Sequence, residues 1–345
     1  MSRQWLVIRA DASTEMGTGH IMRCLALAQA WKDTGGHVTL VTACDNQKLL
    51  QRFRAESFEV VSLPSHTGTL DWKITRDALT RHAGAWLVLD GYHFDEAYQH
   101  RAREGGNRCL VIDDLAHLRH YYADFVLNQN LYAEQLGYSC EPYARLLLGT
   151  RYALLRREFL RRDNSRREFP MVARKVLVTI GGSDPNNVTL RVLEALRNVR
   201  TDGLCVHVVV GDANPHLATI QAEAGQSPHS VALVQDATDM SALMAWADFA
   251  VSAAGSVCWE LAYMGLPSLL LPTADNQKAT ATALENAGAA SIDSSLLSRT
   301  CTMSLLIQSL LEDPAKRKAM SQAISKFVDG GGAARTAAML IHGIL

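Results

Sequence analysis

The sequence lacks an excess of charge of either sign, because 34 lysine and arginine residues stand against 35 aspartate and glutamate residues, for a net charge of −1. A chain without a net field is not expected to attract nucleic acid or an anionic membrane. It also lacks an uninterrupted apolar run of about 18 residues, the length of a membrane-spanning helix. Arg9 and Asp11 interrupt the only early apolar run before it reaches the length of a signal peptide. We therefore expect a cytoplasmic chain with no membrane insertion and no nucleic-acid partner.

Cysteine is sparse and irregularly placed. The 7 cysteines include no Cys-x-x-Cys pair, and the odd count and uneven spacing indicate neither a disulfide framework nor a zinc site. Reduced, mostly buried thiols are expected. Asp-x-Asp, Gly-x-x-x-x-Gly-Lys-Ser/Thr and Gly-x-Ser-x-Gly are also absent, which argues against a metal–diphosphate clamp and a P-loop nucleotidase. We expect no metal and no cofactor.

What the chain does have is a repeated alternation of short apolar runs with amphipathic stretches. Continuous apolar runs indicate strands that are buried on both faces of a parallel sheet. In one amphipathic stretch, Ile21, Cys24, Leu25, Ala28 and Trp31 follow helical spacing along one face. The expected strands are 5–9, 38–42, 86–90, 109–113 and 125–128 in the first half, and 176–180, 205–210, 231–235, 249–252 and 268–272 in the second.

This pattern predicts an α/β protein with two Rossmann-like parallel-sheet domains. We place the domains at residues 1–155 and 174–330, joined by a basic linker at 156–173. Segment 151–175 carries nine Lys and Arg against three Asp and Glu. A solvated linker face is favoured there over a nucleic-acid contact, because interleaved aromatic residues are missing. Residues 331–345 predict a C-terminal helix that docks back on the first domain.

The loops that follow the apolar runs are the candidate site, because open α/β sheets bind ligands beyond the carboxyl ends of their strands. In the first of these loops, Gly17 and Gly19 let backbone N–H groups approach an anion at the start of a helix. Met22 at the third glycine position excludes a dinucleotide fingerprint. The helix dipole favours a neutral imidazole at His20, which makes it a candidate general base, the alternative being a cap or a packing residue. Arg23 suits a phosphate or carboxylate, or an ordinary surface ion pair.

Polar side chains follow three further strands of the first half. Any one of them alone fits an Asx turn or a helix cap better than a site. Their convergence on the ligand-facing rim is what indicates function. These segments are Asp90-Gly91-Tyr92, Asp113-Asp114 and Asn128-Gln129-Asn130.

Two glycine-containing loops of the second half suit a nucleotide diphosphate. The run Gly181-Gly182-Ser183 precedes a helix that we expect from residue 188, and it predicts a second anion-binding turn. A further strand breaks at Gly255 into a helix capped by Ser256, with Glu260 one turn deeper on the same face. Free N–H groups and a hydroxyl suit a diphosphate, and the carboxylate suits the vicinal diol of a ribose. The pair Asn276-Gln277 opens the next helix with amides able to reach a sugar.

Several motifs occur in a characteristic order along almost the whole chain. They are Arg9-Ala-Asp-Ala-Ser, Gly17-Thr-Gly-His-Ile-Met-Arg-Cys, Leu127-Asn-Gln-Asn, Leu148-Gly-Thr-Arg-Tyr-Ala-Leu-Leu-Arg, Gly181-Gly-Ser-Asp-Pro, and Gly255-Ser-x-x-Trp-Glu with Asp275-Asn-Gln. The chain thereby resembles the UDP-2,4-diacetamido-2,4,6-trideoxy-β-L-altropyranose hydrolases of pseudaminic acid biosynthesis. More distantly, its second half is similar to the N-acetylglucosaminyltransferase that makes lipid II. That enzyme has a GT-B fold, with two Rossmann-like domains facing across a cleft.

The resemblance implies a metal-independent hydrolase that cleaves the bond between the anomeric carbon and the UDP oxygen. It makes His20 the base for water, and it makes Tyr92 and Asn276 sugar-side groups. The GT-B pattern places the uracil edge near the backbone of Val234. The expected substrate-binding residues are Asp11, Gly17, Gly19, Arg23, Tyr92, Asn128, Asn276 and Gln277, and the expected UDP-binding residues are Gly181, Gly182, Ser183, Val234, Gly255, Ser256 and Glu260.

The expected partners are thus a UDP-sugar and water, and the product would serve surface polysaccharide or flagellin glycosylation. Two alternatives stay open. A glycosyltransferase on the same fold would pass the sugar to a hydroxyl acceptor, and fold similarity alone does not exclude it. A non-catalytic protein would bind the UDP-sugar without turnover. The motif match and the lack of an exposed apolar and basic surface for a lipid acceptor in the first half favour hydrolysis.

Overall fold

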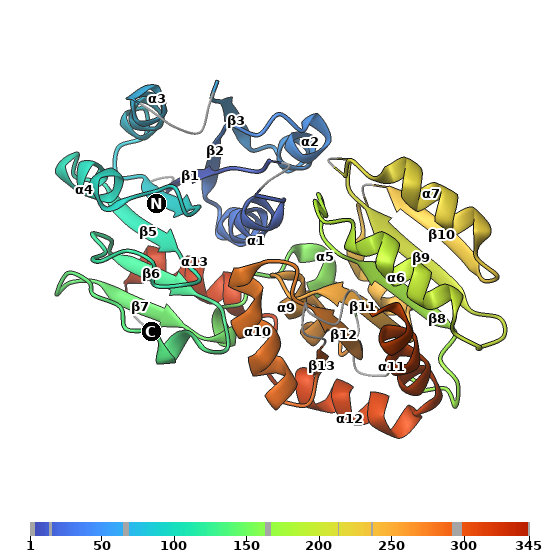
Figure 1. Cartoon of the computed structure of the whole chain (residues 1–345). Helices are drawn as coiled ribbons and strands as arrows, with labels where there is room; N and C mark the ends of the chain where they lie inside the picture. Colours follow the sequence, from blue (N-terminus) through green and yellow to red (C-terminus); the bar gives the residue numbers. More distant parts are fainter. Residues whose placement is uncertain are drawn as a thin grey trace. The chain divides into compact units, whose positions relative to one another are not determined.

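The computed structural model describes residues 4–13, 16–64, 69–162, 167–212, 214–235, 237–291 and 299–343. The chain divides into two compact units (Figure 1). Unit 1 is Met1–Arg157 together with Gly330–Leu345, and unit 2 is Glu158–Asp329. Each unit is built on one parallel sheet, so the expected fold class, α/β with two Rossmann-like domains, is confirmed.

The sheet of unit 1 has the strand order β3-β2-β1-β4-β5-β6-β7, and every neighbouring pair is parallel. The order reverses between β1 and β4, whose carboxyl ends form the topological switch point where such sheets bind ligands. Ala10 at the end of β1 lies beside Asp90 at the end of β4. The strands are β1 (Trp5–Ala10), β2 (His37–Thr42), β3 (Glu59–Ser62), β4 (Trp86–Asp90), β5 (Arg108–Ile112), β6 (Phe125–Asn128) and β7 (Arg145–Leu148).

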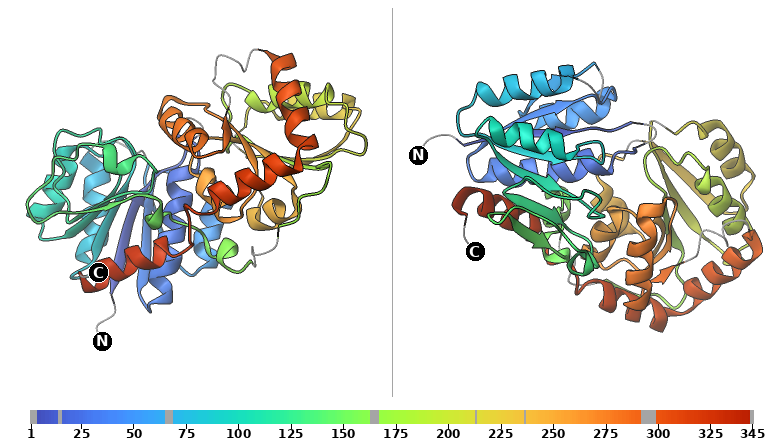
Figure 2. Two further views of the ribbon diagram at one scale, coloured as in Figure 1. Left: turned by 90° about the horizontal axis from the view of Figure 1, so that it is seen from below. Right: turned by 60° about the vertical axis from the view of Figure 1, so that its left-hand side comes forward.

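Helices cover both faces of this sheet, as Figures 1 and 2 show. Successive residues of β1 point to opposite faces, so Leu6 and Ile8 join one buried cluster and Val7 joins another. The predicted apolar stripe of the first helix is confirmed, since Ile21 and Trp31 at its two ends are both buried. The first face carries α1 (Gly19–Asp33), α2 (Gln47–Ala55) and α13 (Gly332–His342), and the second carries α3 (Thr69–Thr80) and α4 (Glu96–Glu104).

Unit 2 repeats the arrangement with the strand order β10-β9-β8-β11-β12-β13, again parallel throughout. Its switch point lies between β8 and β11. The strands are β8 (Lys175–Thr179), β9 (Cys205–Val210), β10 (Ser230–Gln235), β11 (Phe249–Ala253), β12 (Ser268–Leu271) and β13 (Ala290–Ser291). The helices are α5 (Arg157–Leu160), α6 (Val188–Arg197), α7 (Leu217–Gln226), α8 (Met240–Trp246), α9 (Val257–Tyr263), α10 (Asp275–Asn286), α11 (Thr300–Glu312) and α12 (Pro314–Ile324).

All ten predicted strands are present, and each predicted boundary lies within one residue of the observed one. Central strands are buried on both faces and therefore show as continuous apolar runs. The sequence did not reveal β3, β7 and β13, which are short. In β3 no side chain is fully buried, and the first two residues of β7 are exposed. Strands at the edge of a sheet are half solvated, which weakens this signal, although the edge strand β10 was recognised from its apolar residues.

The basic segment between the units is not the solvated linker that its composition predicts. Arg156 is buried, and Arg157 contacts Glu56 at 2.9 Å and Asp33 at 2.7 Å. The guanidinium of Arg167 donates to the backbone carbonyls of three residues, Met244, Ala247 and Met264. These arginines hold backbone and carboxylate oxygens, so the expectation of a solvated face is wrong for them. Residues 163–166 of the predicted linker, like 344–345 of the predicted C-terminal helix, lie outside the described part of the chain.

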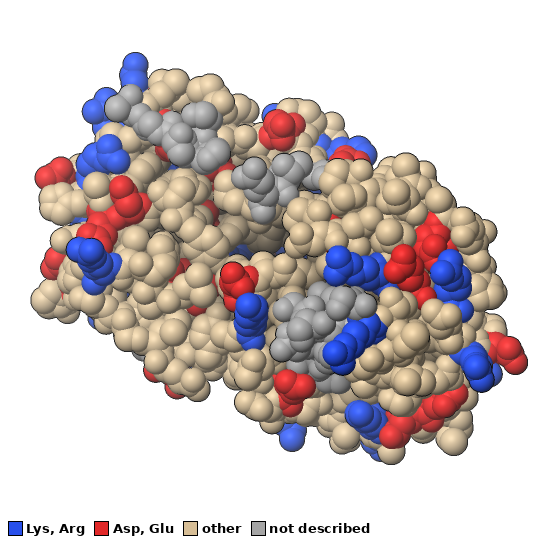
Figure 3. All heavy atoms as spheres, in the orientation of Figure 1, with Lys and Arg blue, Asp and Glu red and all other residues tan. Residues whose placement is uncertain are grey.

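The surface and the thiols agree with the composition. On the face drawn in Figure 3, lysine and arginine side chains are interspersed with aspartate and glutamate. None of the described helices combines the length and the apolar character needed to cross a bilayer. All seven cysteines are free, and four of them are buried, as expected.

The start of α13 packs closely against the backbone of Tyr152 and Ala153, and this close packing depends on the glycine at position 332. A Cβ at Gly332 would lie 2.2 Å from the carbonyl oxygen of Ala153 and 2.5 Å from the carbonyl carbon of Tyr152. Because backbone atoms cannot move aside cheaply, G332A should lower the free energy of unfolding by about 1–3 kcal/mol. Denaturant unfolding measures this. G225A is the matched control, since a Cβ there meets nothing within 4 Å; it should be neutral or stabilising by up to about 1 kcal/mol. Equal effects of the two changes would contradict the close-contact explanation.

Candidate active site

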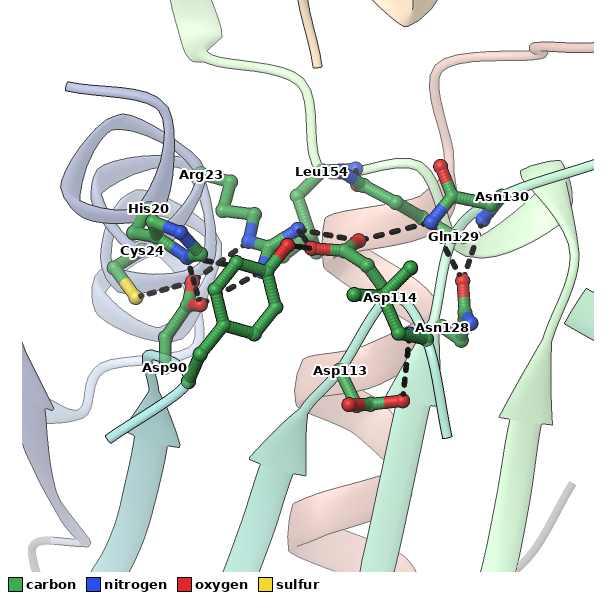
Figure 4. A network of polar contacts seen from close by, with 12 residues as sticks. His20, Arg23, Cys24, Asp90, Asp113, Asp114, Asn128, Gln129, Asn130 and Leu154 are labelled. Atoms are coloured by element: carbon green, nitrogen blue, oxygen red, sulfur yellow. Dashed lines mark hydrogen bonds and ion pairs between the residues drawn. The ribbon is translucent and has the colours of Figure 1, made fainter. Parts of the chain in front are cut away.

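The candidate site of unit 1 forms where α1 begins beside the end of β4. Gly17, with φ +72°, lets the chain turn back so that its N–H donates to the Ser13 carbonyl at 2.9 Å. Gly19 is the first residue of α1, and His20 is the second. Since β1 and β4 are neighbours, the first turn of α1 stands over Asp90, as Figure 4 shows. The fold thus brings His20 and Asp90 together across 70 residues of sequence.

His20 is held by a buried carboxylate. Its Nδ1 lies 2.6 Å from Oδ1 of Asp90, whose side chain is fully buried, while His20 itself is 11% exposed. Arg23 Nη2 lies 3.2 Å from the same ring nitrogen, but an ionised carboxylate only accepts, so the short contact fixes the proton on Nδ1. Nε2 then carries the lone pair. A buried carboxylate thus orients this imidazole, which lies in the first turn of α1.

Asp90 remains ionised in spite of its burial. Burial alone would raise the pKa of this carboxyl, but the charges and hydrogen bonds of Arg23 and His20 outweigh it and hold the pKa well below its usual range. Arg23 donates from Nε to Oδ2 and from Nη2 to Oδ1, both at 2.7 Å. Both carboxylate oxygens of Asp90 are therefore hydrogen-bonded to other side chains. Its role is not that of the Asx turn or helix cap which its position in the sequence favours.

The guanidinium of Arg23 makes its contacts within the protein, and the substrate contact predicted for it stays a prediction. Its side chain is 6% exposed, and beyond its two bonds to Asp90 it donates from Nη1 to both carboxylate oxygens of Asp114, at 2.8 and 3.0 Å. Burial would lower the pKa of Arg23, but the two carboxylates outweigh it and raise the pKa well above the ordinary value. The guanidinium thus bridges two acidic side chains of the protein (Figure 4), which makes Arg23 a positioning residue.

The same bridge fixes Tyr92. The Tyr92 hydroxyl donates to Oδ2 of Asp114 at 3.0 Å, and Asn130 donates to Oδ1 at 2.9 Å. The Tyr92 ring, 36% exposed, meets the His20 ring edge to face at 5.2 Å between centroids. A closed circuit of contacts therefore joins His20, Asp90, Arg23, Asp114 and Tyr92, and it presents the histidine and the tyrosine together.

Two predicted substrate-binding residues lie inside the protein instead. Asp11 is 2% exposed; its Oδ1 accepts from the Ala43 N–H at 2.7 Å and from Arg9 at 2.5 Å. Asn128 is fully buried, accepts from the Asn130 N–H at 2.9 Å, and donates to the Tyr138 hydroxyl at 2.8 Å. In this structure Asp11 and Asn128 hydrogen-bond neighbouring segments of the chain, and the substrate contacts predicted for them stay predictions.

In unit 2, the loop Gly181–Ser183 does not offer the open helix start that we expected. Both carboxylate oxygens of Asp184 accept backbone N–H groups at the start of α6, from Val188 and Thr189, each at 2.8 Å. Asp184 is 4% exposed, so an internal anion already occupies this end of the helix. The predicted anion-binding turn at α6 is corrected accordingly. Gly182 instead packs against Gly211. A Cβ added to Gly211 would lie 2.3 Å from the carbonyl oxygen of Gly182.

The loop after β11 differs from this at the N-cap position of its helix. Ser256 precedes α9 and makes no side-chain capping bond. Gln277 at the start of α10 braces the loop, its Oε1 accepting from the N–H groups of Ala254 at 3.2 Å and Thr273 at 2.9 Å. Gly255, next to Ser256, packs beside the side-chain amide of Gln277. A Cβ added to Gly255 would lie 3.6 Å from the amide nitrogen of Gln277.

The other predicted residues of unit 2 are half-buried. Glu260 lies one turn into α9, Asn276 lies in the first turn of α10, and Val234 lies next to the end of β10. All three are thus at or near the carboxyl ends of the strands. Over the described residues, no group of three or more His, Cys, Asp or Glu side chains is arranged to hold a metal ion.

The predicted set omits Asp90 and Asp114, on which the geometry of His20 and Tyr92 depends. Both stand at strand ends in the sequence, which was the available signal. What the sequence did not show is that β1 and β4 are neighbours and that Arg23 lies between the two carboxylates.

Comparison with known proteins agrees with this architecture. Residues 176–333 match the glycosyltransferase family 28 C-terminal domain. Over 96% of each chain, the sequence is 26% identical to the spore coat polysaccharide biosynthesis protein SpsG of Bacillus subtilis. It is 23% identical to the UDP-2,4-diacetamido-2,4,6-trideoxy-β-L-altropyranose hydrolase of Campylobacter jejuni, over 82% of this chain and 97% of that protein.

Two further likenesses extend these matches. An uncharacterized protein of Methanocaldococcus jannaschii is 23% identical over 77% of this chain, which spans only 55% of that protein's length. The structure is similar to that of MurG from Acinetobacter baumannii, with a TM-score of 0.67 and 14% identity over 98% of this chain and 99% of that one. The chain therefore has a GT-B fold, and its residues 176–333 are similar to the glycosyltransferase family 28 C-terminal domain.

The buried network predicts a specific stability defect in D90N. Removing one charge leaves Arg23 buried with only Asp114 as an anionic partner, so the free energy of unfolding should fall by about 3–5 kcal/mol at pH 7. The folded pKa of Asp90 lies below that of an unfolded aspartate, so its stabilising contribution is complete above about pH 4 and disappears as the pH falls further. The difference between wild type and D90N should therefore shrink below about pH 4.

Urea unfolding at pH 7, 5 and 3.5 tests this prediction. The control is D77N, because the Asp77 carboxylate is 56% exposed and 3.9 Å from Arg76; its effect should stay within about 0.5 kcal/mol. A D90N difference that is the same at every pH would show that folding does not lower the pKa of Asp90.

Proposed function

We propose that the protein is a UDP-sugar hydrolase that releases UDP and a free sugar without a metal ion. The observation that carries the proposal is His20, whose ring is oriented by buried Asp90 at the switch point of a parallel sheet. Similarity to the Campylobacter jejuni hydrolase over 82% of the chain supports UDP-2,4-diacetamido-2,4,6-trideoxy-β-L-altrose as the substrate. That reaction belongs to pseudaminic acid biosynthesis, and the likeness to a spore coat polysaccharide protein supports a role in surface glycans.

In the proposed reaction, His20 Nε2 removes a proton from water as the water oxygen attacks the anomeric carbon. The bond between that carbon and the UDP oxygen breaks, and UDP leaves with the electron pair, which inverts the anomeric configuration. Asp90 keeps the proton on Nδ1 and stabilises the imidazolium that forms. A diphosphate leaves readily, so it needs charge stabilisation more than protonation.

Each unit carries its own set of proposed substrate contacts. In unit 1, His20 and exposed Tyr92 face the sugar and the water. In unit 2, the uncapped loop at Gly255 and Ser256 suits the diphosphate, Glu260 the ribose and Val234 the uracil edge. Gln277 holds the loop through Ala254, and its neighbour Asn276 is proposed as a sugar contact. The match of this half to a glycosyltransferase family 28 domain supports this assignment.

A glycosyltransferase is the alternative that specific observations favour. The family 28 match and the structural likeness to MurG are both to transferases. An imidazole held as His20 is held could deprotonate an acceptor hydroxyl as well as water. The acceptor-dependence of UDP release separates the two functions, and turnover by catalytic amounts of protein separates both from a non-catalytic UDP-sugar binder.

The proposed hydrolase should release UDP from UDP-2,4-diacetamido-2,4,6-trideoxy-β-L-altrose with EDTA present and no acceptor added. NMR should show the free sugar forming with inverted anomeric configuration. In water labelled with heavy oxygen the label should enter the sugar, because the bond to the anomeric carbon is the one that breaks. Label found in UDP would disprove that step, and UDP release only after an acceptor is supplied would establish a transferase.

Loss of the base should affect turnover far more than binding. H20A and H20N are expected to reduce kcat by about 10²–10⁴ while UDP affinity stays within a factor of two or so. Calorimetric titration with UDP measures the affinity. H100A is the matched control, since His100 is also paired with a carboxylate, Glu104 at 3.3 Å, but is half-exposed on α4; its turnover should match wild type. Full activity in H20A would leave His20 with a purely structural role.

A further inference from the structure

A second histidine at the edge of the same sheet is held in the same way as His20. His117 Nδ1 lies 2.7 Å from Oδ1 of Asp113, and the Asp113 side chain is fully buried. Asp113 follows β5 directly, and β5 is the neighbour of β4, at whose end Asp90 stands. Two buried carboxylates on adjacent strands therefore each orient one imidazole at the ligand-binding edge of unit 1.

The surroundings of Asp113 fix the orientation of His117. Burial alone would raise the pKa of Asp113, but hydrogen bonds from His117, the Tyr138 hydroxyl and the Ala116 N–H outweigh it and keep the pKa below its ordinary value. The bonds from Tyr138 and Ala116 measure 2.8 and 2.7 Å. The ionised carboxylate accepts from Nδ1, so Nε2 is the ring nitrogen of His117 that faces away from it. The His117 side chain is 26% exposed.

The two imidazoles flank one aromatic ring. Tyr92 contacts the His20 ring at 5.2 Å and the His117 ring at 5.6 Å between centroids, with both pairs of planes close to perpendicular, at 88°. Because the Tyr92 hydroxyl is bound to Asp114, its ring is fixed between the histidines. His20, Tyr92 and His117 thus form one partly exposed aromatic surface.

The charge beneath this aromatic surface determines which part of a nucleotide sugar can bind to the surface. Three carboxylates, of Asp90, Asp113 and Asp114, lie under the aromatic surface, with the single guanidinium of Arg23 to balance them. An excess of negative charge disfavours a diphosphate and leaves a neutral, polar group as the suitable ligand. Sugars offer such groups in their hydroxyls and acetamides, and their apolar faces pack against aromatic rings.

We propose that His117 is a second substrate-contacting residue of this active site, in which its Nε2 hydrogen-bonds a hydroxyl or acetamido group of the sugar while His20 serves the attacking water. This inference rests on the proposed function for the identity of the substrate. It assigns His117 to sugar recognition rather than to bond cleavage. The residue should therefore influence KM for the UDP-sugar more than kcat, and it should not influence the affinity for UDP.

Two variants of His117 separate substrate contact from support of the loop. In H117N the amide can replace the Nδ1 bond to Asp113, but no atom takes the place of Nε2. In H117Q the longer side chain places its amide near the position of Nε2. H117N should raise KM for the UDP-sugar by roughly 2- to 10-fold, the worth of one hydrogen bond, with little change in kcat or in inhibition by UDP. H117Q should restore most of the loss, and H100A should behave as wild type.

The opposite pattern would overturn the inference. A wild-type KM in H117N, or equal losses in H117N and H117Q, would mean that His117 only supports Asp113 and its loop. If H117N does not fold, the ring nitrogens can be observed directly in ¹⁵N-histidine-labelled H20N protein. The His117 Nε2 resonance should then shift with the UDP-sugar and not with UDP alone, while His100 stays unchanged. A His117 resonance that ignores the UDP-sugar in a protein whose wild type hydrolyses it would refute the role, whereas absent wild-type turnover would refute the proposed function instead.

Discussion

The rest of the site depends on the salt bridges of Arg23. Its guanidinium is buried between the carboxylates of Asp90 and Asp114. Charges in a protein interior are tolerated only when they are paired with good geometry, and here one cation makes short contacts with two anions. Asp90 in turn orients His20, and Asp114 orients Tyr92. The positions of the two exposed groups are thus consequences of one internal salt bridge.

This arrangement also explains why the two units have different chemistry at their sheet edges. In unit 1 the described carboxylates of Asp90, Asp113 and Asp114 stand at the edge with the guanidinium of Arg23. In unit 2, Asp184 already satisfies the start of α6, and the loop at Ser256 lacks a side-chain cap. The two helix starts therefore differ at their caps, and the diphosphate site that we propose is the one at Ser256, with Glu260 in the first turn of the same helix.

How far the sequence could predict this structure follows from what each signal measures. Apolar runs reveal the buried central strands and also the edge strand β10, whereas β3 and β7, at the edges of their sheet, were not recognised. His20 was identifiable because a glycine-containing turn precedes it. The partners of Asp90 depend instead on strand order, since only the pairing of β1 with β4 brings Arg23 and His20 over it. Asp11 and Asn128 show the converse: polar residues at strand ends serve the loops as often as they serve a ligand.

The pair of His20 and Asp90 does not by itself distinguish a hydrolase from a transferase. A base held by a buried carboxylate removes a proton from water or from an acceptor hydroxyl by the same chemistry. The difference lies in what the adjoining surface admits, because water needs no binding site and an acceptor needs one of its own. Around His20 that surface is the exposed ring of Tyr92 with His117 on its other side. If these rings hold the sugar, as we propose, a transferase would need a further surface beside His20 for its acceptor, whereas the proposed hydrolysis needs none.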